Sequence, residues 1–591
     1  MGAGTNAGLV TSIENWLARF NKALQNPDQD RLAVLFAPDS HWRDVLALTW
    51  DIMTISGRDE IASRMCRAAN TLSACNFVIH PDRCPVRLVE RAGVQAIEAI
   101  LAFDTAVGRG EGIIRIRHDA ERPAAPIAWT LLTALDELRG HEETTIAARN
   151  EEPPFARDFH GPNWLDRRQA TAAYTDRDPA VLVIGGGHAG VTTAARLGRL
   201  GVDTLVVDRE DRVGDNWRLR YHGLKLHNQV HSNHLPYLPF PPTWPNYLSK
   251  DKFANWLEAY VESMEINFWT RTTLEHAAFD PQARRWTARL RIANGGSDTI
   301  REIRPRHIVM ATSVSGTPKL PDIPTLDRFA GKVVHSSGFR DGEKWRGRNV
   351  LVFGTGTSAH DIAQDLHGNG ARVTMVQRSP TLVVNVEPSA QIYDGIYLGE
   401  GPSLEDRDLI NASMPLPLTR QSHKLITDQV REFDKPLLEG LEKAGFRLDF
   451  GEDGTGWPLK YRQRGGGYYF NVGCSELIVS GEIGLVQYHD IQAFEAQGVC
   501  MKDGHALQAD LIVLATGYKG QDHLVGSLFG SEVAERVGPI WGFDTRTQEL
   551  RNMWSRTGQP NLWFTAGAFS QCRIYSKYLA LQIKAAEVGL I

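Results

Sequence analysis

Apolar positions in the first part of the chain follow a helical period and then give way to strand-like segments. The helical spacing covers residues 9–24 and ends at the turn-forming residues 26–28. Segments of β-type composition, separated by Gly, Pro and Asp, follow at residues 76–80, 94–104, 112–118 and 127–134. A helix followed by strands predicts an α+β domain over residues 1–150, with a linker over residues 151–177.

From residue 180 onward, short apolar strands alternate with helices, which predicts a doubly wound α/β fold. The apolar run 181–184 leads directly into a G-x-G-x-x-G sequence. In that pattern Gly185 permits the tight turn, Gly187 lets the backbone approach a pyrophosphate, and Gly190 lets helix and strand pack closely. The next strand ends at Asp208, where a carboxylate can accept hydrogen bonds from ribose hydroxyls.

A second copy of this pattern begins at the apolar run 350–353, which enters a turn containing Gly354 and Gly356. Its second strand ends on Arg378 and Ser379, a cation and a hydroxyl suited to a 2′-phosphate. The acid-ended site therefore suits an unphosphorylated ribose such as that of FAD, and the arginine-ended site suits NADPH. Two such sites in one chain predict hydride transfer from NADPH to a flavin.

Composition narrows the class of protein further. Apolar residues make up 42% of the 591 positions and charged residues 23%, with a net charge of −5, so we expect no nucleic-acid partner. The six cysteines form no C-x-x-C pair, which argues against a disulfide framework, a zinc site and a thiol–disulfide reductase. No apolar run reaches the length of a membrane span and no targeting segment is evident at the start, so we expect a soluble, cytoplasmic protein.

Several further motifs carry a family resemblance. Residues 329–339 match an F-x-G-x-x-x-H pattern, residues 213–217 are similar to a G-G-x-W flavin contact with Asp215 in place of the second glycine, and residues 514–518 include A-T-G-Y. Together with residues 221–228, these motifs make the chain from about residue 180 resemble class B flavoprotein monooxygenases, especially the flavin-containing monooxygenase and plant YUCCA-like branch. The resemblance implies two Rossmann-type domains, with the NADPH domain inserted in the FAD domain.

Domain boundaries follow from the motifs. We expect the first part of the FAD domain at 178–325, the NADPH domain at 326–484 and the second part of the FAD domain at 485–591. A helical insertion is expected within the NADPH domain at about 380–467, with its main helical stretch at 422–444.

The resemblance also implies a set of site residues. Those expected at FAD are Gly185, Gly187, His188, Ala189, Gly190, Asp208, Arg209, Asn216, Trp217, His227, Asn228, Thr516 and Gly567. Those expected at NADPH are Gly354, Gly356, Thr357, Ser358, Ala359, Arg378 and Ser379. In this family, reduced FAD and dioxygen give a C4a-(hydro)peroxyflavin that oxygenates a small organic substrate, so no catalytic metal is expected. Asn228 is the candidate polar catalytic residue beside the flavin, with the preceding residue, His227, as the alternative.

The N-terminal domain resembles the NTF2-like (SnoaL-like) cone-shaped domains, through residues 36–44 in particular. Such a cone can hold a ligand, with His41, Asp44 and Asp51 as candidates, but a packing or dimerisation role is favoured because fold does not give function. Homodimerisation is one option that the sequence leaves open.

Several functions stay open at this stage. The leading hypothesis is N- or S-oxygenation or YUCCA-like oxidative decarboxylation of a small organic substrate. The alternatives are Baeyer–Villiger oxygenation of ketones, an NADPH oxidase that releases hydrogen peroxide, and a redox-sensing binding protein. The residue Phe339 weighs against the Baeyer–Villiger reaction, because relatives with that activity usually carry Trp there. Arg573 has two equally weighted interpretations, a contact to substrate or cofactor and a salt bridge.

Overall fold

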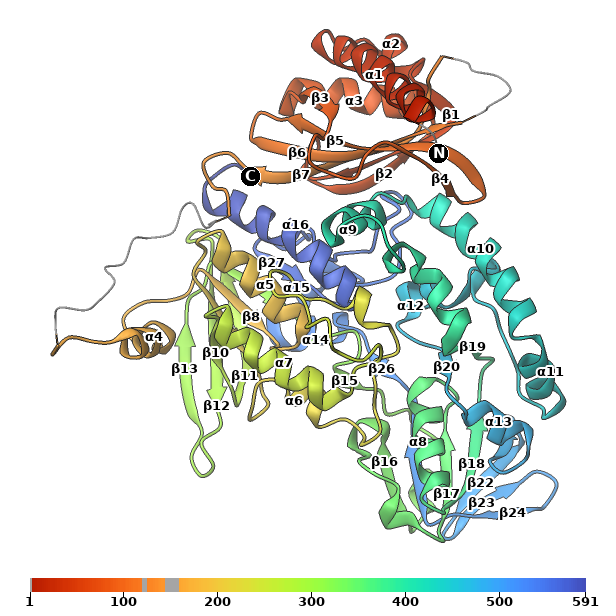
Figure 1. Ribbon diagram of the computed structural model, residues 1–591. Helices are drawn as coiled ribbons and strands as arrows, with labels where there is room; N and C mark the ends of the chain where they lie inside the picture. Colours follow the sequence, from red (N-terminus) through yellow and green to blue (C-terminus); the bar gives the residue numbers. More distant parts are fainter. Residues whose placement is uncertain (1–2, 119–124, 144–158) are drawn as a thin grey trace.

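The computed structural model describes residues 3–118, 125–143 and 159–591 (Figure 1). The N-terminal unit is α+β, as expected, and its apolar helix positions pack on one face of a sheet. Its helices are α1 (Ala3–Gln25), α2 (Gln29–Ala33) and α3 (Arg58–Leu72), and its strands are β1 (Phe36–Val45), β2 (Ile52–Ser56), β3 (Cys75–Ile79), β4 (Arg87–Arg91), β5 (Val94–Asp104), β6 (Gly108–Arg117) and β7 (Ala128–Leu138). The sheet order is β2-β1-β7-β6-β5-β3, with β4 on β5. Trp16, Phe20 and Phe77 lie buried between helices and sheet. The first residues of the expected linker lie outside the described residues.

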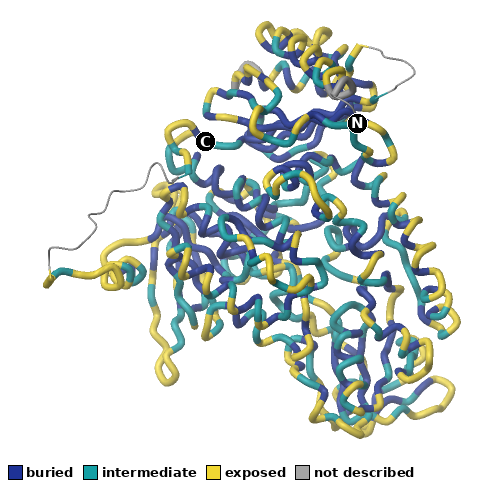
Figure 2. The backbone as a smooth tube through the Cα atoms, in the orientation of Figure 1, coloured by how far each residue is buried: buried dark blue, intermediate teal, exposed yellow. Residues whose placement is uncertain are grey.

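The first Rossmann-type unit contains a five-stranded parallel sheet in the order β10-β9-β8-β14-β27. These strands are β8 (Val181–Ile184), β9 (Thr204–Val207), β10 (Asn267–Trp269), β14 (His307–Met310) and β27 (Leu562–Phe564). The helices of the unit include α5 (His188–Arg199), α6 (Asp215–Arg218), α7 (Lys250–Ser263), α14 (Asp522–Phe529), α15 (Ser531–Val537) and α16 (Phe569–Glu587). An antiparallel sheet of β11 (Thr272–Asp280), β12 (Arg285–Ile292) and β13 (Thr299–Ile303) adjoins it, and the preceding helix α4 (Trp164–Ala173) has no buried residue (Figure 2).

The second Rossmann-type unit is built on another five-stranded parallel sheet, in the order β16-β25-β17-β18-β21. Its elements are β16 (Lys332–His335), β17 (Asn349–Phe353), α8 (Thr357–Gly368), β18 (Arg372–Gln377), α13 (Cys474–Val479), β21 (Gly484–Gln487), β22 (Ile491–Glu495), β23 (Gly498–Met501), β24 (Ala506–Gln508) and β25 (Leu511–Leu514). The wholly buried strand β25 lies between β16 and β17, so strand pairing keeps the chain in this unit to Leu514, whereas we expected it to leave at residue 484. A short antiparallel pair, β15 (Thr317–Pro318) and β26 (Tyr518–Lys519), joins the two units.

The expected insertion carries four helices and a two-stranded parallel pair. They are β19 (Leu382–Asn385), α9 (Leu404–Ala412), α10 (Leu416–Phe433), α11 (Lys435–Lys443), α12 (Gly456–Arg464) and β20 (Tyr468–Asn471). The stretch 422–444 is two helices rather than one continuous helix. The break falls at Asp434, immediately before Lys435 and Pro436, because proline cannot donate the backbone hydrogen bond that would continue α10. At this break the Asp434 carboxylate accepts hydrogen bonds from Asn385 and Ser389.

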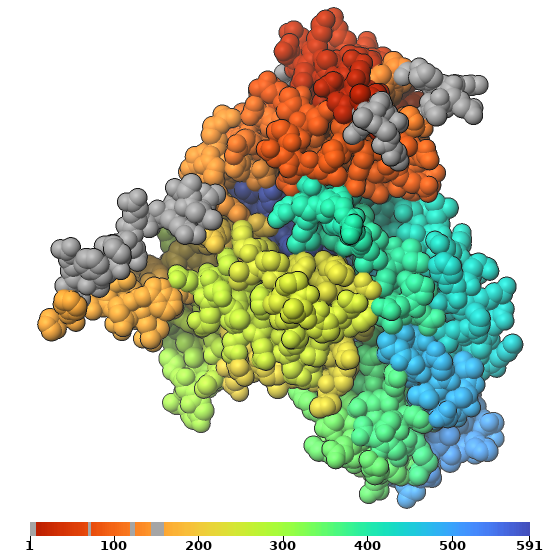
Figure 3. Space-filling view, viewed as in Figure 1, coloured from red at the N-terminus to blue at the C-terminus, as the bar shows by residue number. Residues whose placement is uncertain are grey.

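The N-terminal unit rests on α16 and on the insertion, so that segments far apart in the chain lie side by side (Figures 1 and 3). Charged groups hold this contact: Arg83 pairs with Asp406 of α9 at 3.0 Å, and Lys577 of α16 pairs with Asp136 of β7 at 2.5 Å. Among the residues that the structure places, no helix combines the length and the apolar character needed to cross a bilayer.

Candidate active site

The first glycine-rich turn is packed so tightly that side chains would not fit at its glycines. Gly185 has φ of +108°, and a Cβ atom there would lie 2.5 Å from the carbonyl oxygen of Ala311. A Cβ at Gly190 would lie 2.0 Å from the carbonyl oxygen of Gly185. Helix α5 begins directly after Gly187, so its free N–H groups face the turn, as in sites that bind a pyrophosphate.

Asp208 lies at the end of β9, beside this turn. Its Oδ2 accepts a hydrogen bond from the Gly186 N–H at 2.6 Å, and its Oδ1 accepts one from the Glu210 N–H at 2.9 Å. Both oxygens keep further lone pairs for a ribose. The neighbouring Arg209 is exposed and pairs with Glu210 at 3.1 Å.

An aromatic cluster brings distant sequence motifs to the start of α5. The His188 ring stacks on Phe569 with 4.4 Å between ring centroids, and its Nε2 lies 2.9 Å from the Gly567 carbonyl oxygen. Trp217 also stacks on Phe569, at 5.7 Å. Burial lowers the pKa of His188, so the imidazole is neutral at pH 7. The side chain of Asn216 lies beside Gly187. The structure therefore brings four of the sequence-predicted FAD residues close to the first turn.

The second glycine-rich turn has the same backbone design. Gly354 has φ of +120°, and a Cβ atom there would lie 2.4 Å from the carbonyl oxygen of Ala515. Helix α8 begins at Thr357, whose hydroxyl donates to the Tyr468 carbonyl of the insertion at 3.0 Å. Ser358 is half-buried, and Ala359 is buried in the hydrophobic core of the second Rossmann-type unit. The insertion thus lies against this turn.

The second strand of this unit ends differently from β9. Arg378 and Ser379 are exposed just after β18, and no described residue forms a hydrogen bond or ion pair with the Arg378 guanidinium. Only the backbone carbonyl of Arg378 is used, as an acceptor from Arg447 at 2.5 Å. This uncommitted cation occupies the position that a carboxylate occupies in the first unit.

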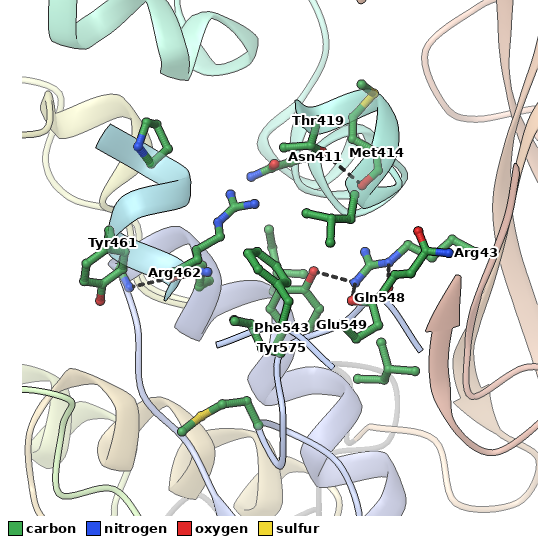
Figure 4. Close-up of a pocket in the computed structure, with 18 of the residues that line it drawn as sticks. Arg43, Asn411, Met414, Thr419, Tyr461, Arg462, Phe543, Gln548, Glu549 and Tyr575 are labelled. Carbon is green, nitrogen blue, oxygen red and sulfur yellow. Dashed lines mark hydrogen bonds and ion pairs between the residues drawn. The ribbon is translucent and has the colours of Figure 1, made fainter. Parts of the chain in front are cut away.

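A cavity of about 680 Å³ lies where the N-terminal unit, the insertion and the C-terminal part of the chain meet (Figure 4). The insertion contributes Tyr461 and Arg462, and the C-terminal part contributes Glu549 and Tyr575. Arg43 of β1 reaches it from the N-terminal unit. No sequence motif marks this junction, so none of these five residues is predicted from the sequence.

Asn228 lines this cavity. Its Nδ2 donates to Asp394 Oδ2 at 2.8 Å, and burial raises the pKa of Asp394 to about 6 even though Arg462 and this hydrogen bond lower it. The alternative candidate, His227, packs on Phe470 with 5.2 Å between ring centroids, and burial lowers its pKa to about 4. Of the two, Asn228 is the one whose side chain borders the cavity.

Other sequence-predicted residues have structural partners. The Thr516 hydroxyl donates to the Lys319 carbonyl at 2.6 Å, at the crossing between the two units rather than at the first turn. His335, the histidine of the F-x-G-x-x-x-H pattern, lies 3.1 Å from the Gly517 carbonyl at the same crossing. Arg573 pairs with Asp408 at 2.6 Å, which favours the salt-bridge interpretation of that residue. Asp44 lies buried in the N-terminal unit and accepts from Thr133 at 2.6 Å.

Metal chemistry has no cluster to use in the described part of the chain, where no group of three or more His, Cys, Asp or Glu side chains could hold an ion. The six cysteines are free thiols. The site is thus defined by two glycine-rich turns, by the opposite charges at the ends of β9 and β18, and by the cavity that Asn228 lines.

Comparisons with known proteins agree with this geometry. A family model described as pyridine nucleotide-disulphide oxidoreductase matches residues 182–394. Indole-3-pyruvate monooxygenase YUCCA1 of Oryza sativa subsp. japonica is 32% identical over 361 residues, which are 60% of this chain and 80% of that protein. Probable indole-3-pyruvate monooxygenase YUCCA9 of Arabidopsis thaliana is 31% identical over 57% of this chain and 74% of that protein.

Solved structures show the same fold at lower identity. An open crystal structure of cyclohexanone monooxygenase has a TM-score of 0.52 at 19% identity and covers 70% of this chain and 88% of that one. A complex of OTEMO with FAD and NADP also has a TM-score of 0.52, at 17% identity, covering 70% of this chain and 86% of that one. The two Rossmann-type units and their site define a flavin-dependent oxidoreductase. The chain belongs to the flavin monooxygenase family, and its relatives include YUCCA-like proteins.

Proposed function

We propose that the chain is an NADPH-dependent FAD monooxygenase, with FAD at the first glycine-rich turn and NADPH at the second. The residues suit these groups: in each turn a Cβ atom at the first glycine, Gly185 or Gly354, would clash with a backbone carbonyl oxygen. Asp208 offers acceptors for an unphosphorylated ribose, whereas Arg378 offers an uncommitted cation for a 2′-phosphate. This opposition of charge at equivalent strand ends is the observation that carries the proposal.

The remaining sequence-predicted residues have roles within it. When bound, the flavin accepts hydride from NADPH and activates dioxygen. Neutral His188 and Trp217 pack beside Phe569 and restrict water at the start of α5. The Asn228 amide, held by Asp394, offers its polar group in the wall of the cavity in which the small organic substrate binds.

Three reaction types fit this function. The relatives named as indole-3-pyruvate monooxygenases support the oxidation of a 2-oxo acid, and N- or S-oxygenation is the other part of the leading hypothesis. The fold shared with cyclohexanone monooxygenase keeps ketone oxygenation as a second candidate.

A further assignment concerns the N-terminal unit, whose helices on one face of a seven-stranded sheet support an NTF2-like domain. Homodimerisation and a cytoplasmic location stay predictions from the sequence.

The function is tested with purified holoenzyme and anaerobic NADPH. We expect bleaching of the flavin absorbance, followed after addition of dioxygen by oxygenated product when a 2-oxo acid, an amine, a sulfide or a ketone is present. The ratio of product to hydrogen peroxide distinguishes a monooxygenase from an NADPH oxidase. Flavin that NADPH leaves oxidised would overturn the proposal and favour a redox-sensing binding protein.

A further inference from the structure

Arg462 brings a positive charge into the wall of the cavity at the junction of the three parts of the chain. Arg462 lines it from α12, and no described residue forms a hydrogen bond or an ion pair with its guanidinium. In Figure 4 its side chain extends from α12 into the space between that helix and Asn411 of α9. Burial lowers the pKa of Arg462, yet a guanidinium stays protonated in proteins, so the cavity holds a positive charge.

Two acidic residues of the cavity, Glu549 and Asp394, accept hydrogen bonds from other groups. Glu549 accepts from Arg43 at 2.8 and 2.7 Å and from the Thr54 hydroxyl at 3.0 Å. Asp394 accepts from Asn228 at 2.8 Å and forms no salt bridge with Arg462, although each charge shifts the pKa of the other group. A buried charge without a partner is costly, because desolvation is then uncompensated. Asp394 and Glu549 offset the charge of Arg462 without a hydrogen bond to it, so its guanidinium keeps its donors for a group that enters the cavity.

Two further polar groups in the cavity wall lack partners. His423 of α10 is 8% exposed and its Nδ1 has no hydrogen-bond partner, and Trp457 of α12 is 9% exposed with an unpartnered Nε1–H. Buried polar groups are nearly always satisfied in folded proteins, so two orphans in one wall indicate a polar ligand. Both residues come from the insertion, as Arg462 does.

The rest of the wall is aromatic. Tyr393, Tyr461, Phe543 and Tyr575 line the cavity and offer ring faces and edges to a flat apolar group. A volume of about 680 Å³ is typical of small-molecule sites that surround most of their ligand. An aromatic wall that also contains the Arg462 guanidinium suits a ligand with an apolar body and one negative charge.

We propose that Arg462 is the specificity-determining residue for an organic anion with an aromatic or apolar body, whose oxyanion it binds in this cavity. The assignment rests on the proposed function, because it names the substrate class of the same site. It gives the insertion a role in recognising the substrate, while the Rossmann-type units bind the nucleotides.

The test is binding of 3-phenylpropionate and of its neutral amide, 3-phenylpropionamide, to the oxidised holoenzyme by titration calorimetry at pH 7.5. We expect the wild type to prefer the acid by about tenfold or more, as charge-assisted hydrogen bonds in buried sites do. Arg462→Gln removes that preference by weakening the acid alone, and Arg462→Lys keeps part of it. The exposed Arg464→Gln, on the same helix, is the matched control and retains the full preference.

Three results would overturn the proposal: equal affinity of the wild type for acid and amide, a preserved preference in Arg462→Gln, or weaker binding of NADP⁺ without any change for the acid. The last would assign Arg462 to the nucleotide. If Arg462→Gln does not fold, the wild-type comparison and Arg462→Lys decide the question. Reduction of the flavin by NADPH without a probe tests the proposed function separately, because the titration requires no turnover.

Discussion

Arg43 and Glu549 form a two-point ion pair that joins the N-terminal unit to the C-terminal part of the chain, 506 residues away in the sequence. Nε of Arg43 lies 2.8 Å from Oε1 of Glu549, and Nη2 lies 2.7 Å from Oε2. The remaining donors of Arg43 reach the Tyr575 hydroxyl, at 2.9 Å, and the Ala412 carbonyl. One side chain of the N-terminal unit therefore holds both α16 and the insertion beside the cavity.

The first prediction follows from this contact. Arg43→Met leaves Glu549 buried without its cation, which costs about 3 kcal/mol or more in comparable buried pairs. We expect a lower Tm in thermal unfolding and, because two walls of the cavity lose a common anchor, a larger share of consumed NADPH appearing as hydrogen peroxide.

Arg64→Met is the matched control for that variant, because Arg64 pairs with Glu60 on the exposed face of α3 at 2.8 Å. Exposed pairs of this kind contribute about 0.5 kcal/mol or less. Equal effects of the two substitutions would mean that the Arg43 contact does not anchor the units.

The second prediction concerns the choice of nicotinamide cofactor. Arg378→Ala removes the uncommitted guanidinium at the end of β18, so we expect KM for NADPH to rise about tenfold or more while KM for NADH changes little. Arg372→Ala, at the opposite end of the same strand, removes only an exposed hydrogen bond to Asn349 and should leave both values unchanged. A parallel loss for both cofactors would argue against a 2′-phosphate contact.

Local sequence was sufficient to predict the two glycine-rich turns, because their backbone demands residues with particular conformational freedom. Strand β8 has the bounds expected from its apolar run, and Gly185 and Gly354 both have the positive φ that glycine tolerates. Likewise, the charge at each strand end is a local property, visible as Asp208 and Arg378 in the chain itself.

The cavity could not be predicted in this way, because its residues are brought together only by the docking of separate units. Arg462 is one of 65 lysines and arginines, and nothing in its neighbours distinguishes it. The uncommitted state of its guanidinium depends on Arg43 already engaging Glu549, a contact between chain segments that no periodicity encodes. The expected end of the NADPH domain at residue 484 differs from the strand pairing for a related reason. Strand β25 pairs with β16 and β17, which precede it by about 160 residues or more.

The third prediction concerns retention of FAD. Gly190→Ala places a Cβ atom 2.0 Å from the Gly185 carbonyl oxygen, so the turn and α5 must move apart. We expect purified protein with a markedly lower flavin-to-protein absorbance ratio and a lower Tm. Gly198→Ala is the control on the same helix: nothing lies within 4 Å of its Cβ, and alanine favours a helix over glycine by up to about 1 kcal/mol. Full flavin occupancy in Gly190→Ala would contradict the assigned role of this turn.

The fourth prediction uses the titration of Asp394 beside Arg462. Burial raises the pKa of Asp394 in the folded protein to about 6, above the value of about 4 expected in an unfolded chain. Its contribution to stability is therefore fully present below about pH 4 and is lost as the pH rises through 6. Asp394→Asn keeps an acceptor for Asn228 and removes the buried charge, so we expect a Tm above that of the wild type at pH 8 and a difference that disappears toward pH 4.

The same substitution should change ligand binding in the direction set by charge. At pH 8 the ionised Asp394 repels an anion near Arg462, so 3-phenylpropionate should bind Asp394→Asn several-fold more tightly than the wild type. As the pH falls from 8 to 5.5, the affinity of the wild type should rise toward that of the variant. Asp453→Asn, an exposed carboxylate of the same insertion, is the control and should follow the wild type at every pH. Weaker binding by Asp394→Asn across this range would mean that Asp394 positions Asn228 for the ligand rather than opposing its charge.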